Sequence, residues 1–176
     1  RWDPRALALY AADGLFDRGM YELAVREYLT VLSAVSNHPR RCELLYRVGE
    51  SHRQLKRVSK AIEYFSKVET DYPSSLFRFK AALRRAEILD AANKTTELFD
   101  LLDATLAAKP PVDIAASAIF LKASALSKAD MKDEAAAAYA RVVSDYSATP
   151  MYSYALLALG GLKAAGPGGS AKAIEL

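Results

Sequence analysis

LYRVGESHRQLKRVSKAIEYFSKVETDYP, residues 45–73, is the stretch that sets the fold of this chain. Apolar residues recur every three or four positions in both halves, on either side of a short polar break. This spacing predicts two helices folded back on each other. Gly49 in the first half and Ala61 in the second are small and let the two backbones come close. Pro73 closes the hairpin, because proline cannot continue a helix.

The hairpin recurs along the chain with a period of 37 residues. The small residue of the first helix returns at each step, and the small and large residues of the second helix return with it. A fixed period of this size is typical of a solenoid, in which each unit buries its apolar face only by stacking on the next. The three series are Ala12, Gly49, Ala86, Ala123 and Gly160; Ala24, Ala61, Leu98 and Ala135; and Tyr28, Phe65, Leu102 and Tyr139.

Cap and turn residues divide the chain into four helix pairs and part of a fifth. Asp3 is the expected N-cap of the first helix, Ser74 or Ser75 that of the third pair, and Asn93 and Asp130 lie in turns. The third repeat has Leu98 where the others have Ala, Thr105 where they have Val, and Arg85 at a usually apolar position. We therefore expect looser packing there. The expected helices are about 4–17 and 21–34, 39–54 and 57–70, 75–92 and 94–108, 113–128 and 131–146, and 150–164, with a second helix of the fifth repeat starting near residue 170.

Composition favours an all-helical protein. Hydrophobic residues make up 52% of the chain, and Val, Ile and Thr never form the alternating runs of a sheet. No window approaches 18 uninterrupted apolar residues, so we expect no membrane-spanning helix. Cys42 is the one cysteine, which excludes an internal disulfide. Because the chain begins at Arg1 and ends within an expected helix, we interpret it as a fragment and leave its compartment open.

The net charge of +3 is unevenly distributed. Residues 38–85 carry 12 basic and 5 acidic side chains, whereas residues 1–37 carry 4 and 5 and residues 86–176 carry 8 and 11. This basic block either attracts an anionic partner or forms a solvated outer face. Its arginines lack the interleaved aromatic residues of single-strand binders, so we expect no nucleic-acid partner. They are Arg40, Arg41, Arg47, Arg53, Arg57, Arg78, Arg84 and Arg85.

These residues resemble the tetratricopeptide repeat family. The pattern of small, aromatic and proline positions covers residues 5–165, and 12 positions separate the two small residues (49 to 61, 123 to 135), as in the family. The resemblance implies one domain, residues 1–176, folded as a right-handed α-α superhelical solenoid. Each repeat here is three residues longer than the usual 34, and the extra residues lie in the link between one repeat and the next. The expected repeats are about 5–38, 39–75, 76–112, 113–149 and, in part, 150–176.

The longer link between repeats, Asp71-Tyr72-Pro73-Ser74-Ser75, resembles that of bacterial cell-envelope members of the family. These include the Tol–Pal-associated division coordinator and outer-membrane assembly lipoproteins. The resemblance implies a scaffold that binds proteins in the periplasm or envelope, catalyses nothing and needs no cofactor. Two alternatives stay open: a cytoplasmic adaptor, and a structural homo-oligomer formed through stacked repeat edges.

In this family the first helix of each pair lines a concave groove. The groove-facing register reads Leu9, Tyr46, Leu83, Phe120 and Leu157 here, and one turn further on lie Asp13, Glu50 and Glu87. An extended or helical peptide with apolar anchors and some basic residues would suit such a surface. Alternatively, the apolar residues pack between helix pairs, and the acidic ones form salt bridges with Arg53, Lys80 or Arg84.

Catalytic and metal chemistry have little support in the sequence. His38 and Cys42 are four residues apart, but no third group orients them, and capping is the simpler role for His38. His52 occupies the register of Leu15, Leu89 and Leu126, which favours a core or groove-edge position. Two histidines and one cysteine lack any metal-site spacing. Residues 166–172 lack the Gly-Lys-Ser/Thr ending of a phosphate-binding loop. We therefore expect neither an enzyme nor a metal site.

Overall fold

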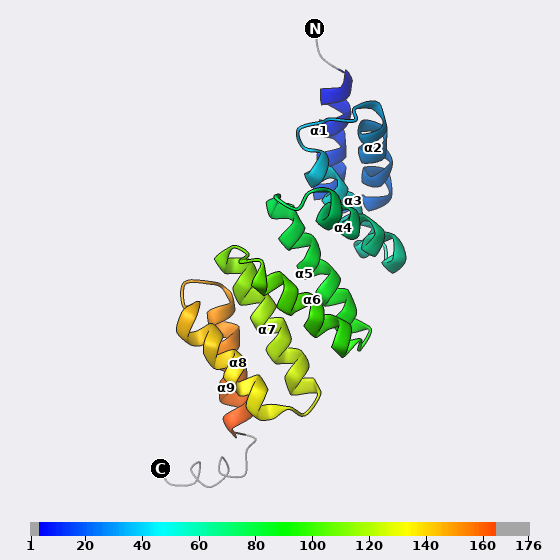
Figure 1. Ribbon diagram of the computed structural model, residues 1–176. Helices are drawn as coiled ribbons and strands as arrows, with labels where there is room; N and C mark the ends of the chain where they lie inside the picture. The colour runs from blue at the N-terminus through cyan, green and yellow to red at the C-terminus, as the bar shows by residue number, and fades with distance from the viewer. Residues whose placement is uncertain (1–3, 165–176) are drawn as a thin grey trace. The chain divides into compact units, whose positions relative to one another are not determined.

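The computed structural model describes residues 4–164, and side chains from Ala6 onward, as helices joined by short turns (Figure 1). No strand occurs within this range, which confirms the all-helical prediction. Every helix begins and ends within two residues of the predicted bounds. Asp3, residues 166–172 and the expected second helix of the fifth repeat lie outside the described residues. The helices are α1 (Pro4–Asp17), α2 (Tyr21–Ala34), α3 (Arg41–Gln54), α4 (Val58–Asp71), α5 (Leu76–Ala91), α6 (Thr95–Ala107), α7 (Val112–Lys128), α8 (Lys132–Asp145) and α9 (Met151–Ala164).

The chain divides into two compact units, Arg1–Arg85 and Ala86–Leu176, with the boundary inside α5. In the first unit α1 packs on α2, α2 on α3, and α3 on α4. In the second unit α6 packs on α7, α7 on α8, and α9 on both α7 and α8. Within each unit these helices therefore pack mainly on their neighbours in sequence, as the 37-residue period predicts.

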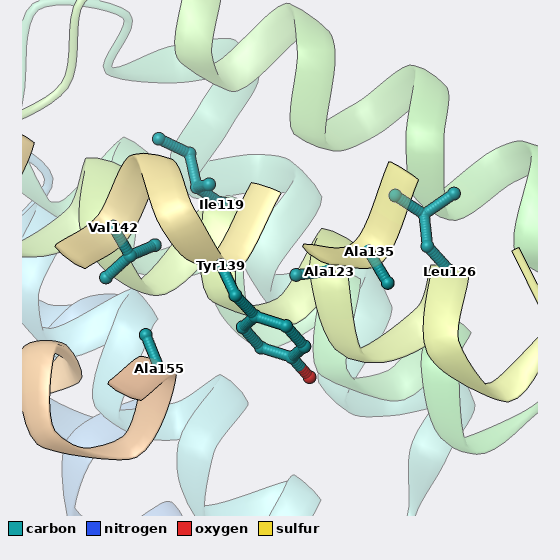
Figure 2. Packing of buried hydrophobic residues seen from close by; sticks show 7 residues of the cluster. All are labelled: Ile119, Ala123, Leu126, Ala135, Tyr139, Val142 and Ala155. Carbon is teal, nitrogen blue, oxygen red and sulfur yellow. The ribbon is translucent and has the colours of Figure 1, made fainter. Parts of the chain in front are cut away.

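The small and large residues of the repeat form the core. Ala12, Ala24 and Tyr28 are fully buried in the first pair, and their counterparts in the second, third and fourth pairs are buried too. Gly160 on α9, which continues the Ala12 series, is exposed. At Gly49 the packing is tight, because a Cβ atom built there would lie 2.8 Å from Cδ1 of Phe65. The glycine is needed for this close approach of α3 and α4. In the second unit, Figure 2 shows the equivalent arrangement, with Tyr139 between Ala123 and Ala155.

The turn inside each pair repeats one backbone geometry. Gly19, Lys56, Asn93 and Asp130, each 37 residues apart, have φ of 75°, 59°, 57° and 60°. The amide after each of them donates a hydrogen bond to a carbonyl five residues earlier, as from Met20 to Leu15 (2.9 Å). This is the Schellman arrangement that ends a helix. The turns at Asn93 and Asp130 were predicted, whereas Lys56 carries no turn signal of its own.

Ser75 is the cap of α5. Its hydroxyl oxygen accepts a hydrogen bond from the backbone N–H of Phe77 (3.2 Å), which satisfies a free donor of the first turn. The prediction of a serine cap is confirmed for this residue.

The unusual residues of the third repeat each have a partner or a buried place. Leu98 and Thr105 are buried, and the Thr105 hydroxyl donates to the Leu101 carbonyl (2.7 Å). Arg85 pairs with Glu69 at 2.9 Å. The looser packing expected here remains a prediction.

Candidate partner-binding surface

The predicted groove residues lie on the first helices of the pairs. The apolar members occupy one register on α1, α3, α5, α7 and α9, and none of them is fully buried. Leu157 is 78% exposed, whereas the other four are half-buried. The acidic members follow one turn later on α1, α3 and α5. In chain order the eight residues are Leu9, Asp13, Tyr46, Glu50, Leu83, Glu87, Phe120 and Leu157.

Tyr46 belongs to an aromatic cluster of the first unit. Its ring centroid lies 5.7 Å from that of Phe65 on α4 and 5.4 Å from that of Phe77 on α5. Such tilted contacts between rings are favourable. Tyr46 thus joins three helices, as the packing alternative expects, and the residue remains half-buried.

Phe120 has the equivalent position in the second unit. Its ring makes edge contacts with Tyr139 on α8 at 5.4 Å and with Tyr154 on α9 at 6.4 Å. It packs against the core cluster of this unit while it remains half-buried. Both aromatic residues therefore stabilise the stacking of helices and also border the surface.

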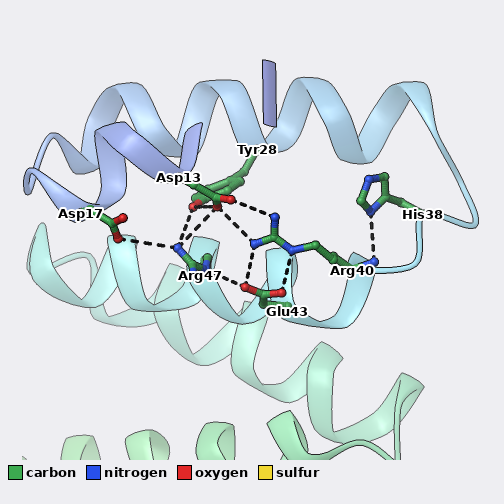
Figure 3. A network of polar contacts seen from close by, with 7 residues as sticks. All are labelled: Asp13, Asp17, Tyr28, His38, Arg40, Glu43 and Arg47. Atoms are coloured by element: carbon green, nitrogen blue, oxygen red, sulfur yellow. Dashed lines mark hydrogen bonds and ion pairs between the residues drawn. The ribbon is translucent and has the colours of Figure 1, made fainter. Parts of the chain in front are cut away.

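Asp13 lies in a network of charged groups between α1, α2 and α3 (Figure 3). Its carboxylate accepts hydrogen bonds from the Tyr28 hydroxyl (2.8 Å) and from Nη1 of Arg40 (2.8 Å). Nη1 of Arg47 lies 3.4 Å away. Glu43 completes the network, because it accepts from Nε of Arg40 (2.7 Å) and Nε of Arg47 (3.0 Å).

The network lowers the pKa of its carboxyl groups. Burial would raise the pKa of Asp13, but hydrogen bonds from Arg40 and Tyr28, with the charges of Arg40 and Arg47, outweigh burial and lower it. The hydrogen bond from Arg40 is the main cause that lowers the pKa of Glu43. Burial raises the pKa of Tyr28, which keeps this phenol protonated. At neutral pH the network holds charged carboxylates.

Glu50 is buried and also paired. It accepts from Nη2 of Arg53 (2.6 Å) and from Nε2 of Gln54 (2.9 Å), and Nε of Arg84 lies 3.3 Å away. Burial would raise the pKa of Glu50, but hydrogen bonds from Arg53 and Gln54, with the charges of Arg53 and Arg84, lower it instead. The alternative of salt bridges with Arg53 and Arg84 is thus observed at this residue. Glu87 is half-buried.

Sequence reasoning missed the partners of Asp13. It named Arg53, Lys80 and Arg84 as candidates, whereas Arg40 and Arg47 make the contacts. Arg40 directly precedes α3 and Arg47 lies in its second turn, so both belong to the next repeat. They could have been found by asking which side chains of each repeat face the helix pair that precedes it.

Intramolecular pairs neutralise much of the basic block. Arg57 pairs with Glu22 at 2.7 Å, and Arg85 pairs with Glu69 at 2.9 Å. Lys60 and Lys67 share Glu63, at 3.0 and 2.9 Å. Together with the arginines around Asp13 and Glu50, these pairs favour a structural role for most of the block.

The sequence candidates for chemistry have structural roles. His38 accepts a hydrogen bond from the backbone N–H of Arg40 (3.1 Å), in the turn that precedes α3. No side chain caps the first turn of α3, so a helix cap at His38 stays a prediction. Cys42 donates to the Ser75 hydroxyl (3.1 Å), and burial raises the pKa of its thiol. His52 is buried and stacks on Tyr64 at 5.6 Å. Within residues 4–164 no group of three His, Cys, Asp or Glu side chains can hold a metal ion.

Residues 4–164 contain no helix that could cross a membrane. None of the helices α1 to α9 combines the length and apolar character that a bilayer span needs.

The helix pairs, their shared turn and their 37-residue register define a helical-repeat solenoid of the tetratricopeptide type. Residues 43–75 and 117–149 each match the family model of the tetratricopeptide repeat. The two segments are two periods apart and coincide with α3–α4 and α7–α8. No curated protein matches the chain.

Solved structures of MamA share this fold. The MamA 41-end structure from Desulfovibrio magneticus RS-1 is 22% identical with a TM-score of 0.69, over 92% of this chain and 85% of that chain. A MamA RS-1 ArsTM double mutant is 21% identical with a TM-score of 0.72, over 96% and 88%. The MamA AMB-1 structure is 16% identical with a TM-score of 0.62, over 93% and 86%. At these identities the likeness establishes the fold alone.

Proposed function

We propose that this chain is a non-catalytic scaffold that binds a peptide or protein segment along the first helices of its pairs. One observation carries the proposal. The register of Leu9, Tyr46, Leu83, Phe120 and Leu157 is apolar in every repeat and fully buried in none. By contrast, Leu44, Ala81 and Ala118, two positions earlier on α3, α5 and α7, are completely buried. Apolar side chains that recur at one partly exposed register suit a repeated set of anchor contacts.

The acidic residues modify the expected ligand. Asp13 and Glu50 already hold arginines of this chain, so a basic group of a partner has to compete with them. Exposed ion pairs contribute little to affinity in any case. Apolar anchors therefore supply most of the binding energy, and basic residues of the partner add orientation.

The cellular setting is part of the proposal. The link at residues 71–75 supports a place in a bacterial envelope assembly, and a cytoplasmic adaptor is the alternative. An upstream signal peptide or lipidation motif in the gene would support the envelope, and a gene without either would contradict it.

A pull-down with matched variants tests the groove. Leu83→Gln/Leu157→Gln removes two anchors without opening the core, whereas Val112→Gln changes an exposed apolar residue outside this register. A partner captured from bacterial lysate by the wild type and Val112→Gln, but lost with the double variant, supports the proposal. Its binding should also slow amide exchange on the first helices. Equal recovery by all three proteins contradicts the proposal.

A structural homo-oligomer is the second candidate. Leu7 is 49% exposed, although its counterparts Leu44, Ala81, Ala118 and Ala155 are fully buried. Leu156 is 48% exposed, although Leu45, Ala82 and Ile119 at its register are buried. Exposed apolar residues at registers that are otherwise buried favour a further packed layer at α1 and α9, which another copy can provide.

A further inference from the structure

A cavity of about 370 Å³ opens beside the second helices of the first unit. It lies among α2, α3 and α4, and the predicted groove residues do not line it. Pockets of this size accept small ligands or a single large side chain of a peptide. Its apolar lining comes from Leu29, Leu32, Leu45 and Tyr64.

The apolar part has a buried floor and an exposed rim. Leu32 and Leu45 are buried, whereas Leu29 is 37% exposed at the edge. The Tyr64 ring is held by stacking on His52. A preformed apolar surface of this kind binds an apolar side chain with little cost of ordering.

Two cations border the same cavity. Nη1 of Arg41 donates to the carbonyls of Leu32 (2.8 Å) and Val35 (3.2 Å), which fixes the guanidinium without neutralising it. Among the residues that the structure describes, Arg41 forms no ion pair, in contrast to most arginines of the basic block. Lys67 lies over the Tyr64 ring at 4.9 Å and shares Glu63 with Lys60.

The balance of charge at the cavity favours an anion. Asp71 is the acidic residue of the lining, against the two cations Arg41 and Lys67. The unit that contains the cavity, residues 1–85, carries 16 basic and 10 acidic side chains. A fixed guanidinium with unused donors beside an apolar floor is suited to a carboxylate.

The second unit provides an internal comparison. Two periods further along the chain, Leu29 is replaced by Asp103, Arg41 by Ala115 and Tyr64 by Ala138. The repeat therefore folds without a leucine, an arginine or an aromatic ring at these registers. Fold stability alone therefore does not explain why Leu29, Arg41 and Tyr64 occur together in the first unit.

We propose that this cavity binds an acidic peptide segment of a protein partner. An apolar side chain of the peptide packs on Leu29 and Tyr64, and a neighbouring carboxylate accepts hydrogen bonds from Arg41 and Lys67. None of the predicted groove residues lines this cavity, so the site is separate from the groove of the proposed function and does not depend on it.

Three labelled peptides test the chemistry: GSEFDSG, GSEADSG without the aromatic ring, and GSQFNSG without the charges. Fluorescence anisotropy at low salt gives the affinities, and amide shifts of the ¹⁵N-labelled protein locate the binding. We expect GSEFDSG to bind about tenfold more tightly than either control, a factor equivalent to one good polar or apolar contact. Its shifts should cluster at residues 29–33, 41–45 and 64–72. Equal affinities, or shifts on the first helices at the groove register, would overturn the proposal.

Variants then test the residues. Leu29→Asp introduces the residue that the second unit already tolerates at this register, so it preserves the fold. Arg41→Gln removes the guanidinium, and Lys94→Gln removes one exposed charge of the second unit as a control. We expect each of the first two to weaken GSEFDSG binding about tenfold, and the control to bind like the wild type. Wild-type affinity in Leu29→Asp would refute the site. Leu83→Gln/Leu157→Gln should leave this binding intact, which separates it from the groove.

Discussion

Gly49 marks the closest approach of two helices in the first unit. Because a Cβ atom would lie 2.8 Å from the Phe65 ring, Gly49→Ala forces the ring or α3 to move. Overpacking of this kind costs about 1–3 kcal/mol. We expect the free energy of unfolding to fall by this amount in urea titrations followed by circular dichroism.

Gly160 is the matched control, three periods further along the chain. A Cβ atom at this position meets no other atom within 4 Å. Gly160→Ala should therefore stabilise α9 by about 0.5–1 kcal/mol, because alanine loses less backbone entropy in a helix. If both alanines changed stability in the same direction, close packing at Gly49 would not be the cause.

Lys56 has the left-handed backbone that Gly19 adopts in the first repeat. A left-handed conformation costs a residue with a Cβ atom about 1–2 kcal/mol relative to glycine. Lys56→Gly should therefore raise the free energy of unfolding by roughly 1 kcal/mol, which thermal unfolding can measure. Gly19→Ala should have the opposite sign. A loss of stability in Lys56→Gly would show that the lysine side chain outweighs the backbone strain.

At the scale of elements, the network around Asp13 joins α1, α2 and α3. The folded-state pKa values of Asp13 and Glu43 lie below their ordinary 3.8 and 4.5. Both groups thus contribute stability above pH 4.5, and this contribution is lost as the pH falls through their lowered values. We expect the urea midpoint to decrease steadily below pH 4.5.

Asp13→Asn/Glu43→Gln is the variant that isolates this effect. Its neutral side chains cannot change protonation, so its stability should vary less between pH 6 and pH 3 than that of the wild type. A parallel pH profile in the two proteins would assign the acid sensitivity to other carboxylates.

The same network shows what sequence reasoning can and cannot predict. Helix bounds follow from periodicity and caps such as Ser75, because these signals are local. The prediction of the partners of Asp13 was wrong, because Arg40 and Arg47 contact Asp13 only where one helix pair stacks on the next. That stacking is a tertiary property that spacing along one helix does not encode. The register of Tyr46 was predicted from the 37-residue period, but its contacts with Phe65 and Phe77 also depend on stacking.

At the scale of the whole molecule, charge is distributed unequally between the two units. Residues 1–85 have a balance of +6, from 16 basic and 10 acidic side chains, and residues 86–176 have −3, from 8 and 11. Many of the cations form ion pairs within their own unit, which reduces the electrostatic field that each unit exerts on another copy. It is still sufficient to orient an encounter between oppositely charged surfaces of two copies.

The opposite charges of the two units therefore predict association between copies. We expect the mass from light scattering to rise with protein concentration and to fall with added salt, because opposite charges attract and salt screens them. Leu7→Lys/Leu156→Lys should remain monomeric, since it places charges on the exposed apolar residues of α1 and α9. Val112→Lys is the control and should associate like the wild type. A constant monomer mass in all three proteins would exclude the homo-oligomer and leave the binding of a separate protein as the function of the scaffold.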